Sequence, residues 1–230
     1  MFMGTTAVKR ADPHFASVVL LADFDGDLTD YSNSGHVATN TGVTFATEDT
    51  PFRIGGQTAN FNGVSYFTYP DSADWDFGSG DFTVEVWDKH TALVTDAVIA
   101  QFGSNDKGWA MFNDGNGPLQ FIHGVSGGSG NSATLQYTHG NDASSYKHLA
   151  VSRVGNTLYM CYDGVIRSTQ SVTGVTFVNS ARPLTFGANN NGSSAQLTGR
   201  LSEARITKGV GRYSGSVSDA ISVTAPFPKQ

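Results

Sequence analysis

The sequence predicts an all-β protein, and three observations support this prediction. The 230 residues include 27 Gly and only 15% charged residues, a composition that suits many short strands joined by turns. Residues 82–87 alternate Phe82, Val84 and Val86 with polar or aromatic neighbours, the period-two pattern of a strand with two different faces. No segment of about ten residues has helical periodicity, so helix is expected only as single turns.

The chain is predicted to contain one domain preceded by a short arm. Residues 1–16 are polar and interrupted by Pro13, which indicates an N-terminal arm or docking segment. Residues 17–230 contain no linker and no internal repeat. Their number suits a single β-sandwich, which often needs about 200–250 residues.

Composition and charge argue against several classes of function. The net charge is −6, so no clustered basic surface for nucleic acid is expected. The longest apolar run, residues 18–22, is far shorter than the ~18 residues of a membrane span. The N-terminus lacks the pattern of a secretory signal, so a cytoplasmic origin is expected. Cys161 is the only cysteine, and we expect its thiol to be buried in a strand and inert.

The first half of the sequence predicts strands separated by polar turns. A strand over residues 17–25 precedes a turn over 27–35, dense in Asp, Ser and Asn side chains that cap their own backbone. Residues 36–45 are predicted to be extended, and residues 47–56 to form a loop. Further strands are expected before a turn at residues 62–63 and over residues 66–69, 82–87 and 96–102.

The second half continues this pattern. Gly155-Asn156 and Asp163-Gly164 predict tight hairpin turns, and the glycine-rich residues 124–131 predict a loop. Trp87 and Trp109 lie within alternating strands and are expected in the core. Strands are predicted over residues 109–113, 119–123, 133–137, 147–153, 157–162, 165–172, 183–188 and 196–207.

Several motifs occur in the order found in one family of β proteins. After an opening strand and turn over residues 21–36 come Asn60-Phe-Asn-Gly63, Gly80-Asp-Phe-Thr-Val-Glu-Val-Trp87, His148-Leu-Ala-Val-Ser-Arg153 and Arg182-Pro-Leu-Thr-Phe-Gly187. Together with the last motif, described next, they cover residues 17–228. The chain resembles the laminin-G-like, concanavalin A-like family, which implies an all-β, two-sheet antiparallel jelly-roll sandwich over residues 17–230.

The most specific motif lies near the end of the chain. Residues 205–213 (Arg-Ile-Thr-Lys-Gly-Val-Gly-Arg-Tyr) and 224–228 (Thr-Ala-Pro-Phe-Pro) are similar to laminin-G-like domains of tailed bacteriophages. This resemblance implies a non-enzymatic structural protein of the virion, as a head decoration, collar or tail-associated jelly roll. The implied partners are other virion proteins, and the implied assembly is a homo-oligomer, with a trimer as one option.

Glycan binding for adhesion to a host surface is the alternative function, and it belongs to a different class. Tyr69 and Trp75 could stack on sugar rings, and Asp71, Asn189 and Asn191 could bind hydroxyl groups from polar loops. A jelly roll also needs aromatic residues in its core, so the two rings have a structural explanation as well.

A group of acidic residues allows one metal site. Asp23, Asp25, Asp27 and Asp30 lie close together in a predicted turn, and Ca²⁺ prefers carboxylate and carbonyl oxygens. The spacing is not that of an EF-hand. The alternative is that these side chains are solvated and cap their own turn. No other cofactor is indicated, because the six His residues have no metal-ligand spacing.

Catalysis is not predicted. A glycoside hydrolase needs two carboxylates about 5–10 Å apart, and hydrolases of this architecture usually carry Glu-x-Asp-x-Glu on one strand. The chain has only three Glu residues, at positions 48, 85 and 203, and no such triplet. We expect Glu85 or Glu203 to form a partly buried ion pair with Arg205, and His148 to be structural.

Overall fold

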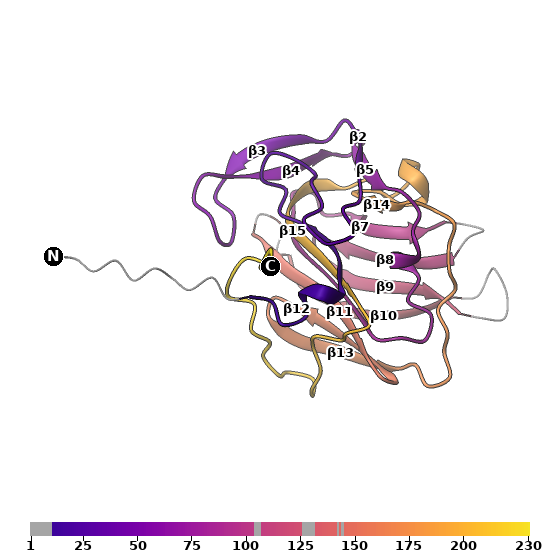
Figure 1. Cartoon of the computed structure of the whole chain (residues 1–230). Helices are drawn as coiled ribbons and strands as arrows, with labels where there is room; N and C mark the ends of the chain where they lie inside the picture. The colour runs from indigo at the N-terminus through magenta and orange to yellow at the C-terminus, as the bar shows by residue number, and fades with distance from the viewer. Residues whose placement is uncertain (1–10, 104–106, 126–131, 142, 144) are drawn as a thin grey trace.

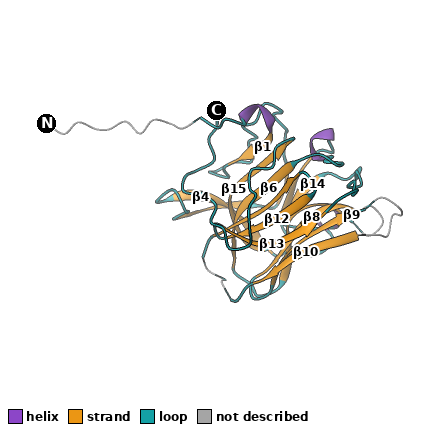
Figure 2. Cartoon of the chain, turned by 90° about the horizontal axis from the view of Figure 1, so that it is seen from below, coloured by secondary structure: helices purple, strands orange, loops and turns teal. Residues whose placement is uncertain are grey.

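The computed structural model describes residues 11–103, 107–125, 132–141, 143 and 145–230 (Figure 1). These residues form two antiparallel β-sheets joined by turns and loops, as Figure 2 shows. Within them, helix is limited to three 3₁₀ turns: η1 (Phe15–Ser17), η2 (Ala73–Trp75) and η3 (Asn190–Gly192). No helix in this part of the chain is long and apolar enough to cross a membrane. The predicted all-β jelly-roll sandwich is confirmed.

The first sheet has eight strands. Its main path runs, in spatial order, through β13 (Val165–Ser171), β12 (Thr157–Tyr162), β11 (Lys147–Val154), β6 (Phe82–His90), β15 (Thr198–Lys208), β4 (Gly56–Asn62) and β3 (Thr44–Glu48). Strand β1 (Val18–Ala22) pairs with the second half of β15, beyond the part of β15 that pairs with β4. The long strand β15 therefore joins three neighbours.

The second sheet has seven strands. In spatial order these are β10 (Ser132–Thr138), β9 (Pro118–Gly124), β8 (Lys107–Asp114), β7 (Thr95–Phe102), β14 (Leu184–Phe186), β5 (Tyr66–Tyr69) and β2 (Thr39–Thr41). The four strands β7 to β10 are consecutive in the sequence and adjacent in the sheet, whereas β14, β5 and β2 pair with strands that are distant in the sequence.

The main core lies between the sheets and is rich in aromatic rings. The predicted inward face of β6 supplies Phe82, Val84 and Val86, all fully buried. Phe82 stacks on Phe77 at 4.2 Å between ring centroids. Trp109 is buried as predicted, and its Nε1 donates to the Trp75 carbonyl oxygen. Because many rings interlock across the two sheets, the framework that carries the surface loops is rigid.

A β-bulge in β15 decides which side chains face outward. Leu201 pairs with Asp88 of β6, and Ala204 pairs with Val86, so two residues of β15 lie opposite one residue of β6. A bulge of this kind shifts the alternation of side chains by one position. As a result, Leu201 and Ala204 are both in the main core, while Glu203 contacts the C-terminal segment on the opposite face.

The outer face of the first sheet, turned away from the second sheet, is covered by the two terminal segments. Val18, Leu21 and Trp87 form a small apolar cluster there with Phe227. Farther along this face, Cys161 and neighbouring residues pack against partly buried residues of the same C-terminal segment. The C-terminal segment, yellow in Figure 1, also pairs with the start of β13 through the carbonyl oxygen of residue 219.

Three expectations differ from the structure or lie outside it. Residues 36–45 do not form one extended run, because Gly42, with φ of 79°, separates β2 in the second sheet from β3 in the first. Trp87 is buried but belongs to the outer cluster instead of the core between the sheets. Most of the loop predicted over residues 124–131 falls on residues 126–131, outside the described residues.

Candidate functional site

The Asp-rich turn after β1 is anchored in the core by one ring. Phe24 has a φ of 52°, a left-handed conformation that non-glycine residues seldom adopt. Its buried ring contacts Phe67 and Phe186 at 5.6 and 5.9 Å between centroids. The burial of this ring directs the neighbouring Asp23 and Asp25 side chains to the surface.

The side chain of Asp30 holds the turn together through hydrogen bonds. Its Oδ1 accepts hydrogen bonds from the backbone N–H groups of Leu21 and Ser32 at 3.0 and 2.9 Å. Its Oδ2 accepts from the Ser32 hydroxyl at 3.0 Å and from the His36 backbone N–H at 2.9 Å. The carboxylate is buried, and these four donors stabilise its charge, so Asp30 is a structural residue of the turn.

The other carboxylates of the turn point to different partners. Asp25 pairs with Arg53 at 2.5 Å, and Asp23 pairs with Lys229 at 2.7 Å. Asp27 is exposed, and its Oδ1 accepts from the Thr29 backbone N–H at 2.8 Å.

The four carboxylates are therefore not gathered into the Ca²⁺ site that the sequence allowed as one alternative. In the described part of the chain, no group of three or more His, Cys, Asp or Glu side chains is placed to hold a metal ion. The physical reason is that Arg53 and Lys229 neutralise Asp23 and Asp25, while backbone donors satisfy Asp30. The turn-capping alternative describes Asp27 and Asp30.

A surface depression of about 490 Å³ lies against this turn. Its lining combines polar and apolar side chains. The lining residues are Gly26, Asp27, Leu28, Thr29, Asp30, Gly35, His36, Val37, Ala38, Asn40 and Phe45. Val37 is 77% exposed, so its apolar side chain is open to contact with a ligand.

The side chain of His36, another lining residue, is held in place by two contacts. Its Nε2 lies 2.9 Å from Asp74 Oδ2, and the Ser34 hydroxyl donates to the same oxygen at 2.8 Å. The imidazole also packs against Trp75 at 4.6 Å between ring centroids. Because Asp74 receives both contacts, Ser34 and His36 are not arranged as a nucleophile and its base.

The predicted glycan-binding residues are not gathered at one place. Tyr69 and Trp75 are both buried, with 0% and 1% of their surface exposed, so neither ring can stack on a sugar. Their expected role as an exposed platform is therefore corrected. Each of the two residues instead contacts a residue that lines the depression. The Tyr69 hydroxyl donates to the Leu28 carbonyl oxygen at 2.9 Å, and the Trp75 ring packs against the His36 imidazole.

The three polar residues of that prediction lie elsewhere. Asp71 Oδ1 accepts a hydrogen bond from Gln101 Nε2 at 3.1 Å. Asn189 pairs with Ser194 within its own loop, which also contains Asn191 with a φ of 56°. None of the three lines the depression.

The sequence prediction missed His36, Asn40 and Phe45. The contact between His36 and Asp74 joins residues 38 positions apart, which no local spacing can indicate. Phe45 lies on β3 beside β4 of the first sheet, and Asn40 lies on β2 of the second. The depression is therefore formed where the two sheets meet at one edge, and only the folded topology brings its parts together.

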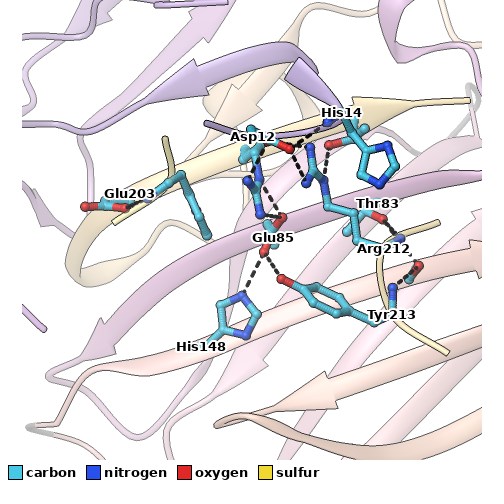
Figure 3. Close-up of polar contacts among 12 residues, drawn as sticks. Asp12, His14, Thr83, Glu85, His148, Glu203, Arg212 and Tyr213 are labelled. Atoms are coloured by element: carbon cyan, nitrogen blue, oxygen red, sulfur yellow. Dashed lines mark hydrogen bonds and ion pairs between the residues drawn. The ribbon is translucent and has the colours of Figure 1, made fainter. Parts of the chain in front are cut away.

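A second polar arrangement lies on the outer face of the first sheet (Figure 3). Glu85 of β6 is fully buried and accepts four contacts. Arg205 donates from Nε and Nη2 at 2.8 Å, His148 Nε2 lies at 3.0 Å, and the Tyr213 hydroxyl donates at 2.7 Å. Burial by itself raises the pKa of Glu85, but the Arg205 charge and the hydrogen bond to His148 outweigh it and hold the pKa below its ordinary value.

Asp12 extends this network to both terminal segments. Its carboxylate accepts from Arg205 Nη1 at 2.9 Å and from Arg212 Nη1 and Nη2 at 3.0 and 2.8 Å, as Figure 3 shows in part. Its backbone N–H donates to the Gln230 carbonyl oxygen at 2.9 Å. One side chain thus holds the N-terminal segment, the C-terminal segment and β15 together.

Glu203 is a buried carboxylate that accepts a single hydrogen bond from the residues that the structure describes. Its Oε2 accepts from the Phe227 backbone N–H at 2.9 Å. Burial raises the pKa of Glu203 to about 7, although this hydrogen bond and the charge of Arg53 oppose the rise. The neighbouring depression of about 510 Å³ is lined by Asp12, Arg205 and residues of the C-terminal segment.

The network of the outer face is a structural one. The predicted ion pair of Arg205 is confirmed with Glu85, and His148 contacts the same carboxylate, as its predicted structural role requires. Both arginines that line the neighbouring depression already face carboxylates, so this depression offers no uncompensated charge to a ligand. The depression at the Asp-rich turn is therefore the better candidate for a binding site.

Comparison with solved structures finds similar folds among toxin binding domains. The binding domain of Paraclostridial Mosquitocidal Protein 1 is 14% identical, with a TM-score of 0.67 over 86% of this chain and 50% of that chain. The binding domain of botulinum neurotoxin serotype G is 15% identical, with a TM-score of 0.65 over 84% of this chain and 48% of that chain. A botulinum neurotoxin DC binding domain in complex with SialylT is 13% identical, with a TM-score of 0.58 over 85% and 49%.

These likenesses concern the fold, and the chain spans about half the length of the structures it matches. No curated protein matches the sequence significantly. A model of the concanavalin A-like lectin/glucanases superfamily, in its laminin-G-like form, matches residues 61–210, which are more than half of the chain. The protein therefore belongs to the laminin-G-like branch of the concanavalin A-like lectin/glucanase superfamily.

Proposed function

We propose that this protein is a non-enzymatic glycan-binding module and that the glycan binds in the depression at the Asp-rich turn. The observation that carries the proposal is the lining of this depression, where an exposed carboxylate and a fixed imidazole adjoin the exposed Val37 and the partly buried Phe45. The fold supports it, because the similar solved structures are named as binding domains and the family is lectin-like.

The chemistry of the lining suits a sugar ring. Sugar hydroxyl groups are donors and acceptors, and Asp27, Thr29 and His36 offer complementary groups. The C–H face of a sugar is apolar and can pack on Val37 and Phe45, which both line the depression. Ligand sites usually combine an apolar surface with a few fixed polar groups, and the Asp74 contact fixes His36.

The state of the three glutamates supports a binding role over hydrolysis. Glu85 is engaged by Arg205, His148 and Tyr213, and Glu48 accepts contacts from Lys89 and Arg200. Paired carboxylates in an open cleft are what a retaining or inverting glycosidase needs. No Glu lines the depression at the Asp-rich turn, and of the two Asp residues that do, Asp30 is engaged by four hydrogen bonds that hold the turn.

A glycan array probed with the purified full chain tests this proposal. We expect binding to a defined set of glycans and no release of reducing sugar from the bound glycans. Because one similar structure is a complex with SialylT, the array should contain both sialylated and uncharged glycans. Absence of binding to any glycan would contradict the proposed function, and release of sugar would contradict its non-enzymatic part.

Assembly into a tailed-phage virion stays a proposal that rests on the sequence resemblance of residues 205–213 and 224–228. It places the protein on the particle surface as a homo-oligomer that contacts other virion proteins, and it is compatible with glycan binding. Cryo-electron microscopy of virions that encode the protein tests it. Ordered copies on the head or tail would support it, and particles that lack the protein would contradict it.

A further inference from the structure

The charges around the depression at the Asp-rich turn indicate which class of glycan it accepts, an inference that rests on the proposed function. Asp27 and Asp30 line the depression. The Asp74 carboxylate lies next to it, in contact with His36. No Lys or Arg is among the residues that line it.

The nearest cations of the turn are engaged elsewhere. Arg53 pairs with Asp25 and also donates to the Asp23 carbonyl oxygen at 3.1 Å. Lys229 pairs with Asp23 and lies 3.4 Å from the centroid of the Tyr31 ring. Neither cation lines the depression, so neither is placed to bind an anionic ligand there.

The side chain of His36 does not change the sign of the charge around the depression. If the imidazole is neutral, the Asp74 charge beside it is uncompensated; if it is protonated, the two charges cancel. In both states of His36 the negative charges of Asp27 and Asp30 remain, and neither carboxylate has an ion-pair partner among the described residues. The charge in and beside the depression is therefore negative in either state.

We propose that this depression selects uncharged glycans and rejects glycans that end in sialic acid or carry sulfate. An anionic group brought beside Asp27 meets like charge at short range, which is unfavourable even near the surface. Hydroxyl groups of uncharged sugars instead donate to the carboxylate, a charge-assisted hydrogen bond. Selection by repulsion of the wrong ligand is a common route to specificity.

Calorimetric titration with a matched pair of glycans tests this proposal. The pair consists of the uncharged glycan that binds most tightly on the array and the same glycan extended by terminal sialic acid. We expect the sialylated form to bind at least about tenfold more weakly, which corresponds to about 1.4 kcal/mol. This ratio should decrease at high salt, because salt screens the repulsion.

The variant Asp27→Asn keeps an acceptor for the Thr29 backbone N–H and removes the charge. We expect it to reduce the ratio between the two glycans severalfold. The matched control is Asp219→Asn, since Asp219 is an exposed residue that also accepts a backbone hydrogen bond, from Ser216, and lies outside the depression. The control should keep the ratio of the unchanged protein.

The possible outcomes separate this proposal from the proposed function. Equal or tighter binding of sialylated glycans would overturn the charge selection and leave glycan binding intact. The same would follow if Asp27→Asn left the ratio unchanged. Absence of any glycan binding would overturn both proposals.

Discussion

Arg205 lies directly opposite Glu85 on the neighbouring strand, and its Nε donates to Glu85 Oε1 over 2.8 Å. The pair joins β15 to β6 on the outer face of the first sheet, where the terminal segments exclude water from it. A buried carboxylate of this kind is stable only when its charge is compensated. The geometry of this pair explains why the last motif of the sequence carries an arginine at position 205.

Removing the charge of Glu85 should strongly destabilise the protein. In Glu85→Gln, the buried Arg205 guanidinium loses its closest counter-charge, and we expect unfolding to become easier by about 3 kcal/mol. Urea denaturation followed by tryptophan fluorescence measures this change.

The double variant Glu85→Leu with Arg205→Met is the control for this interpretation. Apolar residues of similar volume often replace a buried ion pair with little loss of stability. The double variant should therefore be more stable than Glu85→Gln. A double variant that is less stable than the single one would show that packing of these side chains, and not their charge, is decisive.

We expect Asp12 to hold both terminal segments against the first sheet. Asp12→Asn removes the charge that faces Arg205 and Arg212, and we expect a loss of roughly 2 kcal/mol, typical of hydrogen bonds to charged groups. Limited proteolysis should cut the C-terminal segment faster in this variant. The control Asp27→Asn, at an exposed turn outside the C-terminal segment, should be cut at the rate of the unchanged protein. Equal rates for all three proteins would contradict this role of Asp12.

Glu203 should make stability depend on pH near neutrality. Burial raises the pKa of Glu203 from 4.5 to about 7, so the folded protein retains this proton to a higher pH than the unfolded chain. The stabilising contribution is complete below about pH 4.5 and is lost as the pH rises through 7. The difference between the two pKa values corresponds to about 3 kcal/mol.

The isosteric variant Glu203→Gln isolates this effect. Its amide oxygen can still accept from the Phe227 backbone N–H, but it does not titrate. Unfolding free energies measured between pH 5 and 8 should fall more steeply with pH for the unchanged protein than for the variant. Parallel curves would mean that Glu203 does not titrate in this range.

Cys161 should be unreactive in the folded protein. Burial, together with the nearby Glu85 charge, raises the pKa of the Cys161 thiol to about 12, and only the thiolate reacts readily. A chromogenic thiol reagent at pH 8 should react within minutes in urea and far more slowly without it. Equal rates in the two conditions would contradict the buried position.

Much of the fold follows from local sequence patterns. The alternation of Phe82, Val84 and Val86, the hairpin turns and the absence of helical periodicity are all local, and the strands they predict are present. The bulge between Leu201 and Ala204 was not predicted, because residues on both strands decide the register. The division of residues 36–45 between the two sheets likewise depends on which strand each half pairs with. In the sequence, only Gly42 indicates this division.

The residues of the candidate binding site were harder to predict from the sequence than the strands. Asp27 and Asp30 were singled out from the sequence, but as ligands of a metal ion, because sequence does not show that Arg53 and Lys229 neutralise their neighbours. Tyr69 and Trp75 illustrate the same limit. An aromatic residue beside a polar loop has the same local pattern whether its ring faces a ligand or the core.

The most direct test of the central claim, that glycan binds at the Asp-rich turn, is a calorimetric titration of two tryptophan variants. Thr29→Trp places a large ring in the depression, and Thr176→Trp places the same ring at an exposed position outside it. With the uncharged glycan that binds most tightly, we predict at least about tenfold weaker binding for Thr29→Trp and unchanged binding for Thr176→Trp. Unchanged binding by a folded Thr29→Trp variant would contradict the account and place the glycan elsewhere on the protein.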